Sequence, residues 1–393
     1  MKKEEIVNFF LQKGLNIDPS GLEYFYENPE EIKKFLEKTE KMDKKPTMVN
    51  LEVIKKLIKE GYDKIEVIKK FPTPMKKVSV DDISKNLAER YEKIRKFFLN
   101  RIDLVNPISI NKITPKTRRF SLVAMVREKN EENKTILVED MTGEITTHIN
   151  NLNFDSIVTD EVLGLTCERN DDRIEVVGVL WPDIPLKREI SRLEEDVYCM
   201  FLSDLQLNQE FDSKAKKILG EIRQLTYKQL YIFLFGDKST DNKSIERFVE
   251  KLPEKCKVIV IYSPANPIET KNANYFSSPS FLTVGGKINM LLCDGELFSI
   301  YKSLWNKKKP EEVMLNLLKK RHLDPIFKPE KLFMEDHLMI EPVPDIFVSG
   351  NLGSPGILNY KGTTIISCGG FSTEPLYWIL NLRTRESIKI SLA

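Results

Sequence analysis

The C-terminal half of the chain alternates short apolar runs with helical stretches, and this alternation constrains the fold more than any other feature of the sequence. Each apolar run is rich in Val, Ile, Leu or Phe and has the length of one strand. The runs span residues 197–204, 231–237, 258–262, 290–295, 345–350 and 363–370. Strands separated by helical segments are typical of a layered α/β domain, and we expect one over residues 189–393.

Polar side chains follow five of these strands in succession, where each strand ends. They belong to Asp204, Asp237 after Gly236, Asn266, Asp294 before Gly295, and Asn351 after Gly350. A single polar residue after a strand is ordinary turn chemistry. Ligands of layered α/β proteins, however, bind beyond the carboxyl ends of the strands. Five such ends in a row therefore favour a functional site, either present or lost.

The preceding residues, 81–188, predict a helix followed by a small β-barrel. From Asp82 onward, apolar residues recur every three or four positions, as on one face of a helix. Short strands with polar turns follow at 120–126, 135–140, 144–149 and 173–181. This texture suggests a barrel such as an OB-fold. Its basic loop is a candidate nucleic-acid contact and consists of Lys112, Lys116, Arg118 and Arg119. Phe120 and Trp181 lie nearby and could stack on bases, although a tryptophan in such a place is more often a core or interface residue.

The N-terminal stretch before this helix differs from the rest in its pattern of apolar and charged residues. Two apolar stripes at helical spacing predict a helical N-terminal module over residues 1–40. Residues 41–80 begin with a charged, proline-containing stretch and are expected to be a linker with a short helix. The whole chain is thus predicted to be multidomain α+β.

Composition excludes several function classes. The net charge of +2 supplies no global attraction to nucleic acid, so only local patches could act. The five cysteines form no CxxC pair, which argues for buried thiols and against a zinc site. The sequence has no phosphate-binding GxxxxGK[ST] loop and no HExxH motif. It also has no apolar run long enough to span a membrane and no signal core, so we expect a cytoplasmic protein, nucleoid-associated if prokaryotic, without membrane contact.

The polar strand ends resemble the motifs of calcineurin-like metallophosphoesterases. That family carries Asp-x-His, Gly-Asp, Gly-Asn-His-Asp, His-Gly and Gly-His-x-His in this order. More specifically, residues 80–393 resemble the small subunit of the archaeal family-D DNA polymerase, which is related to the B-subunits of eukaryotic replicative polymerases. The segments that carry the resemblance are ERYEKIRKFF, WPDIPL, KKRHLDPIF, VPDIFVSGNL and YKGTTIISCGGF.

The resemblance implies an OB-fold joined to a phosphoesterase domain that proofreads as a 3′–5′ exonuclease, while a large partner subunit polymerises DNA. This chain keeps Asp204, Asp237 and Asn266 of the motif. Where the family has histidines, it has Gln206, Pro267, Asp294, Val348, Asn351 and Gly353. Its three histidines lie elsewhere, and we expect structural or surface roles for them; they are His148, His322 and His337.

The departures predict a vestigial site with no confident catalytic residue, at Asp204, Gln206, Asp237, Asn266, Asp294 and Asn351. Without two bound metals no bridging hydroxide forms. No cofactor is required, although an all-oxygen quartet could weakly hold Mg²⁺ or Mn²⁺; it consists of Asp237, Asn266, Asp294 and Asn351.

We therefore expect a non-catalytic accessory subunit of a DNA polymerase. Its expected partners are a large catalytic subunit and, within that complex, DNA. Two alternatives stay open: an active 3′–5′ exonuclease or phosphoesterase with an altered metal site, and a single-strand DNA-binding OB module.

Overall fold

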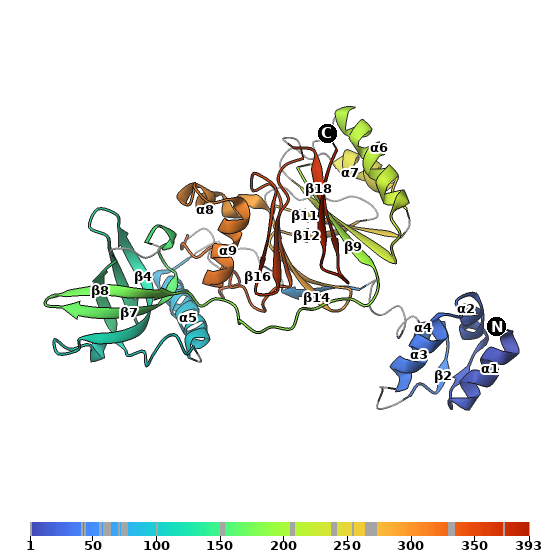
Figure 1. Cartoon of the computed structure of the whole chain (residues 1–393), viewed down its shortest axis with the longest axis horizontal. Helices are drawn as coiled ribbons and strands as arrows, with labels where there is room; N and C mark the ends of the chain where they lie inside the picture. The colour runs from blue at the N-terminus through green and yellow to red at the C-terminus, as the bar shows by residue number, and fades with distance from the viewer. Residues whose placement is uncertain are drawn as a thin grey trace.

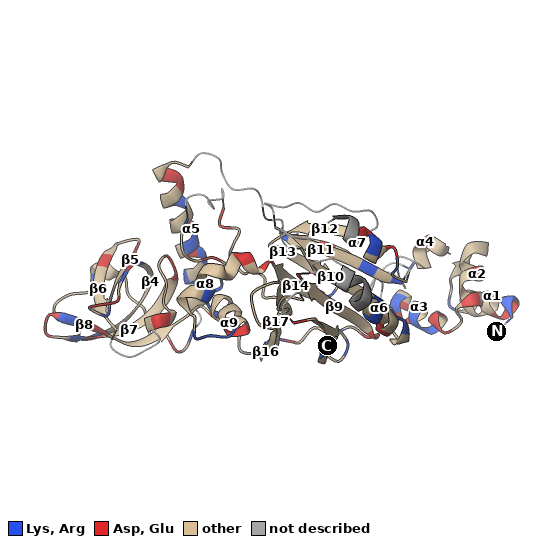
Figure 2. Ribbon diagram, turned by 90° about the horizontal axis from the view of Figure 1, so that it is seen from above, with Lys and Arg blue, Asp and Glu red and all other residues tan. Residues whose placement is uncertain are grey.

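The computed structural model describes three parts of the chain along its long axis (Figure 1). The N-terminal helices lie at one end, a two-sheet α/β part in the middle, and a barrel at the other end. Basic and acidic residues are interspersed along the ribbon (Figure 2). The described residues are 2–40, 42, 45–54, 57, 64–69, 71, 78–99, 101–149, 154–204, 209–236, 242–253, 255–263, 273–328, 335–371 and 374–392.

The N-terminal part consists of helices and two very short strands that share one core. These elements are α1 (Lys3–Gln12), β1 (Asn16–Ile17), α2 (Pro19–Glu27), α3 (Glu31–Glu40), β2 (Met48–Val49) and α4 (Leu51–Ile54). Asp18 caps α2 by accepting a hydrogen bond from the Gly21 N–H at 2.7 Å. Val49 and Ile54 are fully buried against the same phenylalanines as α1–α3. The helical unit therefore continues past residue 40, where the sequence pattern ended it.

Helix α5 and the barrel follow. Helix α5 (Val80–Phe98) begins with a capping box formed by Ser79 and Asp82. The barrel closes in the order β4-β5-β6-β8-β7. Its strands are β4 (Arg119–Asn130), β5 (Thr135–Asp140), β6 (Gly143–His148), β7 (Val162–Asn170) and β8 (Arg173–Leu180). A Cβ on Gly164 would lie 2.9 Å from the Phe98 ring, so α5 packs directly on β7. The predicted small barrel is confirmed as a closed five-stranded one.

The α/β part contains two six-stranded sheets packed face to face. The first has the order β12-β11-β10-β9-β18-β19. Its strands are β9 (Val197–Ser203), β10 (Gln229–Phe235), β11 (Cys256–Tyr262), β12 (Asn274–Ser277), β18 (Leu376–Asn381) and β19 (Ser387–Ser391). The second has the order β16-β17-β15-β14-β13-β3. Its strands are β3 (Ile65–Lys69), β13 (Ser280–Val284), β14 (Ile288–Cys293), β15 (Ile346–Ser349), β16 (Gly356–Tyr360) and β17 (Thr363–Ser367).

Helices cover the outer face of each sheet, which produces four layers. The apolar faces of α6 (Gln209–Gln224) and α7 (Asn242–Val249) contribute to one core with the first sheet. The second sheet packs on α8 (Ser299–Leu304) and α9 (Pro310–Lys320). The mixed α/β architecture predicted for this half of the chain is confirmed. None of the described helices is long and apolar enough to cross a membrane.

The stretch expected as a linker contains one strand of this domain. Strand β3 pairs antiparallel with β13, which comes much later in the sequence. It occupies the edge of the second sheet, where it has one neighbour and only partly buried side chains. Because the strand is short and carries the charged residues Glu66 and Lys69, the pattern alone did not reveal it.

Candidate functional site

The ends of four strands, two from each sheet, meet at one edge of the α/β part. A Cβ on Gly295, after β14, would lie 2.3 Å from the Gly350 carbonyl oxygen, after β15. A Cβ on Gly350 would in turn lie 2.4 Å from the Phe235 Cβ at the end of β10. The Asn351 N–H donates a hydrogen bond to the Ser203 hydroxyl at the end of β9, at 2.7 Å. Glycine is required at 295 and 350 because a side chain would collide with the neighbouring chain.

Three of the six predicted site residues are described, and they all follow these strand ends. Asp204 is buried and has a positive φ of 54°. Asp294 caps the 3₁₀ helix η4 (Gly295–Phe298), accepting a hydrogen bond from the Glu296 N–H at 3.0 Å. Asn351 is exposed and also has a positive φ, 40°. The other three, Gln206, Asp237 and Asn266, lie outside the described residues.

The described donors alone do not assemble a metal site. Among the residues that the structure describes, no three His, Cys, Asp or Glu side chains are grouped as metal ligands. Asp294 uses one carboxylate oxygen to cap η4, which leaves fewer lone pairs for a cation. Because Asp237 and Asn266 are not described, the predicted oxygen quartet stays a prediction.

Two positions where the resembled family has histidines offer little to a ligand site. Val348 is fully buried within β15 and belongs to the core between the two sheets. Gly353 has a φ of 125°, and a Cβ there would lie 2.2 Å from Lys302 Nζ. A side chain at 353 would therefore need both a strained backbone and a displaced lysine.

The basic loop of the barrel is exposed, but neither of the two aromatic residues expected beside it is free to stack on bases. All four basic side chains, at 112, 116, 118 and 119, are exposed, and Arg119 pairs with Glu168 on β7. Phe120 points into the barrel core, and the Trp181 N–H donates to Glu161 at 3.0 Å. Phosphate contacts by this loop stay a prediction, and these two aromatic residues pack toward the barrel interior and a buried carboxylate.

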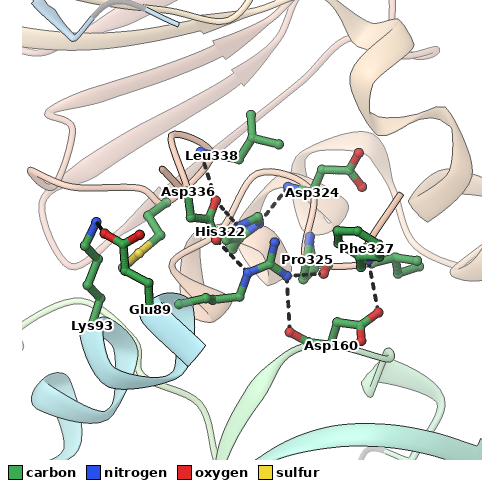
Figure 3. Close-up of polar contacts among 12 residues, drawn as sticks. Glu89, Lys93, Asp160, His322, Asp324, Pro325, Phe327, Asp336 and Leu338 are labelled. Carbon is green, nitrogen blue, oxygen red and sulfur yellow. Dashed lines mark hydrogen bonds and ion pairs between the residues drawn. The ribbon is translucent and has the colours of Figure 1, made fainter. Parts of the chain in front are cut away.

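A buried polar network joins α5, the barrel and the second sheet's helical layer, and no pattern in the sequence predicts it (Figure 3). Arg90 on α5 donates to Asp336 at 2.6 Å, to the Pro325 carbonyl at 2.6 Å and to the Asp160 carbonyl beside the barrel at 3.3 Å. His322 contacts the same carboxylate at 2.9 Å. Arg90, His322 and Asp336 are all buried.

The geometry assigns the tautomer of His322. Its Nδ1 accepts a hydrogen bond from the Asp324 N–H at 3.1 Å, so that nitrogen carries no proton. The proton therefore sits on Nε2, which donates to Asp336. Burial lowers the pKa of His322 below its ordinary value, consistent with a neutral ring. His322 and the guanidinium of Arg90 instead hold the pKa of Asp336 below its ordinary range, against the effect of burial.

The neutral His322 makes a pH-dependent stability contribution that can be measured. The unfolded chain binds a proton at the ordinary pKa of 6.5, whereas the folded chain binds it only at lower pH. Stability from this group is therefore present above pH 6.5 and falls below it, by up to about 1.4 kcal/mol per pH unit. We expect the urea midpoint to drop between pH 7.5 and 5.5.

The pKa of His337 is lowered as well, so the measurement uses a His337→Gln background. In that background His148→Gln is the matched control, because His148 lies on β6 of the barrel, outside the buried network. A midpoint that stays flat or rises on acidification would refute the neutral assignment of His322.

Similarity to known proteins runs along three quarters of the chain. No protein-family model matches the sequence. The DNA polymerase II small subunit of Archaeoglobus fulgidus is 24% identical, with 75% of this chain and 71% of that protein covered. The DNA polymerase II small subunit of Methanothermobacter thermautotrophicus is 23% identical, with 75% of this chain and 73% of that protein covered. The one of Thermoplasma acidophilum is 24% identical, with 76% of this chain and 72% of that protein covered. The chain is thus similar to several archaeal DNA polymerase II small subunits.

The solved structures that resemble the chain do so only distantly. An archaeal phosphodiesterase is 11% identical, with 50% of this chain and 99% of that chain covered, at a TM-score of 0.30. A predicted phosphoesterase from Streptococcus pneumoniae is 14% identical, with 51% of this chain and 99% of that chain covered, at a TM-score of 0.30. Scores this low do not assign a fold.

Proposed function

We propose that the chain is a non-catalytic accessory subunit of a DNA polymerase, where it serves as a scaffold for a large catalytic subunit. The observation that carries the proposal is its similarity to several archaeal DNA polymerase II small subunits over about 75% of its length. We assign the barrel to the OB-fold class and the α/β part to the calcineurin-like phosphoesterases. The helical N-terminal unit is assigned as a separate module.

The scaffold role is supported by what the chain keeps and what it lacks. It keeps the tightly packed strand ends, where Gly295 and Gly350 allow neighbouring backbones to touch. It lacks the histidines of the resembled motif, and Val348 and Gly353 stand at two of their positions. Retained packing without the imidazoles is the pattern expected when a domain is used for docking.

Copurification tests the proposal directly. A tagged copy expressed in the native host should retain a large polymerase subunit in a stoichiometric complex through size-exclusion chromatography. An accessory subunit is defined by that partner, so recovery of the chain only as a free monomer would contradict the proposal. Metal analysis of the same complex reports whether Mg²⁺ or Mn²⁺ is bound at the oxygen quartet.

The non-catalytic part of the proposal has its own test. The complex and the free chain are assayed for Mn²⁺-dependent degradation of DNA 3′ ends, with Asp237→Ala as the matched variant. We expect no activity that depends on Asp237, because the motif histidines are absent. Degradation that the Asp237→Ala substitution abolishes would instead establish an exonuclease with an altered metal site.

A further inference from the structure

The helical N-terminal unit, formed by α1–α4, contacts the α/β part through two ion pairs. Lys34 Nζ on α3 lies 3.1 Å from a carboxylate oxygen of Glu195, which shortly precedes β9. Glu31, at the start of the same helix, has a carboxylate oxygen 3.1 Å from Nζ of Lys228, which directly precedes β10. The two pairs therefore join the unit to the amino ends of two neighbouring strands of the first sheet.

The charges on the two sides of this contact are complementary in pattern as well as in sign. Glu31 and Lys34 are three residues apart, so they lie on one face of α3. Glu195 and Lys228 lie on neighbouring strand starts, since the Lys228 N–H donates to the Asp196 carbonyl at 2.9 Å. An acid and a base on the helix thus meet a base and an acid on the sheet. Exchanging the partners would bring like charges together, so the pattern favours one orientation of the unit.

Apolar packing contributes little to this contact. The core of the helical unit is built from α1–α4 and their connections, and within the described residues it shares no side chain with the cores of the two sheets. Phe9, Leu11 and Tyr26 of the unit stay exposed. Figure 1 shows the unit at one end of the molecule, beyond the first sheet. The position of the unit on the sheet is therefore held mainly by charge.

Both ion pairs are open to solvent, which makes them weak and sensitive to salt. The side chains of Glu195 and Lys228 are 42% and 50% exposed. An exposed ion pair shifts an equilibrium by only about 1.4- to 5-fold. Its attraction is screened as the Debye length shrinks from about 30 Å at 0.01 M salt to about 3 Å at 1 M. Two such pairs suffice at low salt because the unit is tethered to the sheet by the chain, which raises its effective concentration there.

We propose that the two ion pairs form a salt-sensitive latch, which holds the helical unit on the amino edge of the first sheet at low ionic strength and releases it at high ionic strength. Release requires no unfolding, because the unit and the sheets each have a core of their own. The latch lies at the opposite ends of β9 and β10 from Ser203 and Phe235, which border the candidate site. It is defined by residues of this chain alone and does not rest on the proposed function.

Zero-length carbodiimide cross-linking of the full chain tests the latch, because this reagent joins an amine to a carboxylate only where the two are in contact. Peptide mass spectrometry measures the yield of the cross-link between Glu31 and Lys228. The yield is normalised to that of Lys13 with Glu40, an exposed pair at 3.3 Å within the helical unit. We expect the normalised yield to fall at least about fivefold between about 0.01 M and about 1 M salt.

Charge reversal at the other ion pair supplies the variants. Lys34→Glu places like charges together and should lower the normalised yield of the Glu31–Lys228 cross-link about tenfold at low salt. Adding Glu195→Lys restores an attractive pair of reversed polarity, and the yield should return to within about twofold of the parent. Lys33→Glu is the matched control, because Lys33 is the exposed neighbour on α3 and undergoes the same change of charge.

Four outcomes would overturn the latch. They are no cross-link between Glu31 and Lys228 in the parent at low salt, a normalised yield that does not depend on salt, equal yields in the Lys34→Glu and Lys33→Glu variants, and no recovery in the double variant. Glu195→Lys alone tests the same contact from the sheet side, so the result does not depend on the folding of one variant.

Discussion

Replacing Lys320 by methionine is expected to lower the free energy of unfolding of the barrel and α/β unit by about 3–5 kcal/mol. Lys320 Nζ lies 2.5 Å from a carboxylate oxygen of Glu161, and each side chain is only 1% exposed. The ammonium also donates to the Ser156 carbonyl at 2.7 Å and lies over the rings of Trp181 and Trp305. Methionine would leave the Glu161 carboxylate as a buried charge without its partner.

The double variant Lys320→Met, Glu161→Gln separates charge from packing. It removes both charges, and glutamine keeps an oxygen that can accept the hydrogen bond from Trp181. We expect it to be more stable than the single variant, because the uncompensated charge is gone. Urea denaturation measures all three proteins, with Lys287→Met as an exposed lysine control. A double variant no more stable than the single one would contradict the role of the ion pair.

The second large effect is expected at Asp336. Asparagine at this position would remove the charge that compensates Arg90, whose side chain is only 5% exposed. It would also replace one acceptor for His322 and one for the Leu338 N–H by an amide that can offer only one oxygen. We again expect a loss of about 3–5 kcal/mol, because a buried guanidinium is left without its counter-charge.

Asp172→Asn is the matched control, since that carboxylate is exposed in the turn between β7 and β8. Its effect should stay within about 0.5 kcal/mol. Limited proteolysis adds a local readout. Because Arg90 bonds to residues at 160, 325 and 336, the Asp336→Asn variant should be cleaved faster near these segments. Equal stability of the two variants would show that Arg90 gains nothing from the carboxylate.

The clusters around Lys320 and Asp336 share one segment, which also carries part of the resemblance to polymerase small subunits. The segment KKRHLDPIF spans residues 319–327, and four of its polar residues are buried. Lys320 bonds to Glu161, Arg321 to the Ile340 carbonyl, His322 to Asp336 and Asp324 to Tyr301. The segment thus connects the α/β part to the barrel and to α5.

Most of the central strands could be predicted from the sequence, and most of the edge strands could not. All six apolar runs of the C-terminal half are strands in the structure, because each is buried on both faces. The short strands β12 and β16 were not predicted, since their side chains are only partly buried and carry no strong period. Strand β18 was also not predicted, although it is fully buried; it follows the last predicted run closely. It pairs with β9, the first strand of the domain in sequence order.

The candidate site could likewise be predicted only in part. The sequence placed polar residues after consecutive strands, and the structure brings Asp204, Asp294 and Asn351 to one edge. It did not reveal that Gly295 and Gly350 must be glycines, because the close approach of two chain segments is a property of packing. The sequence left Trp181 open as a core, interface or stacking residue, and only the structure shows that its N–H donates to the buried Glu161 carboxylate.

By itself, the sequence determined the type of most central elements, the likeness to polymerase small subunits and the absence of the motif histidines. These are properties of residue type, spacing and order along the chain. Only the tertiary structure decided that β3 joins a sheet whose other strands come much later in the sequence, and that Lys320 and Asp336 are buried with partners. The physical reason is that apolar periodicity specifies which face of an element is buried, whereas the partner of a buried charge is chosen by contacts between distant segments.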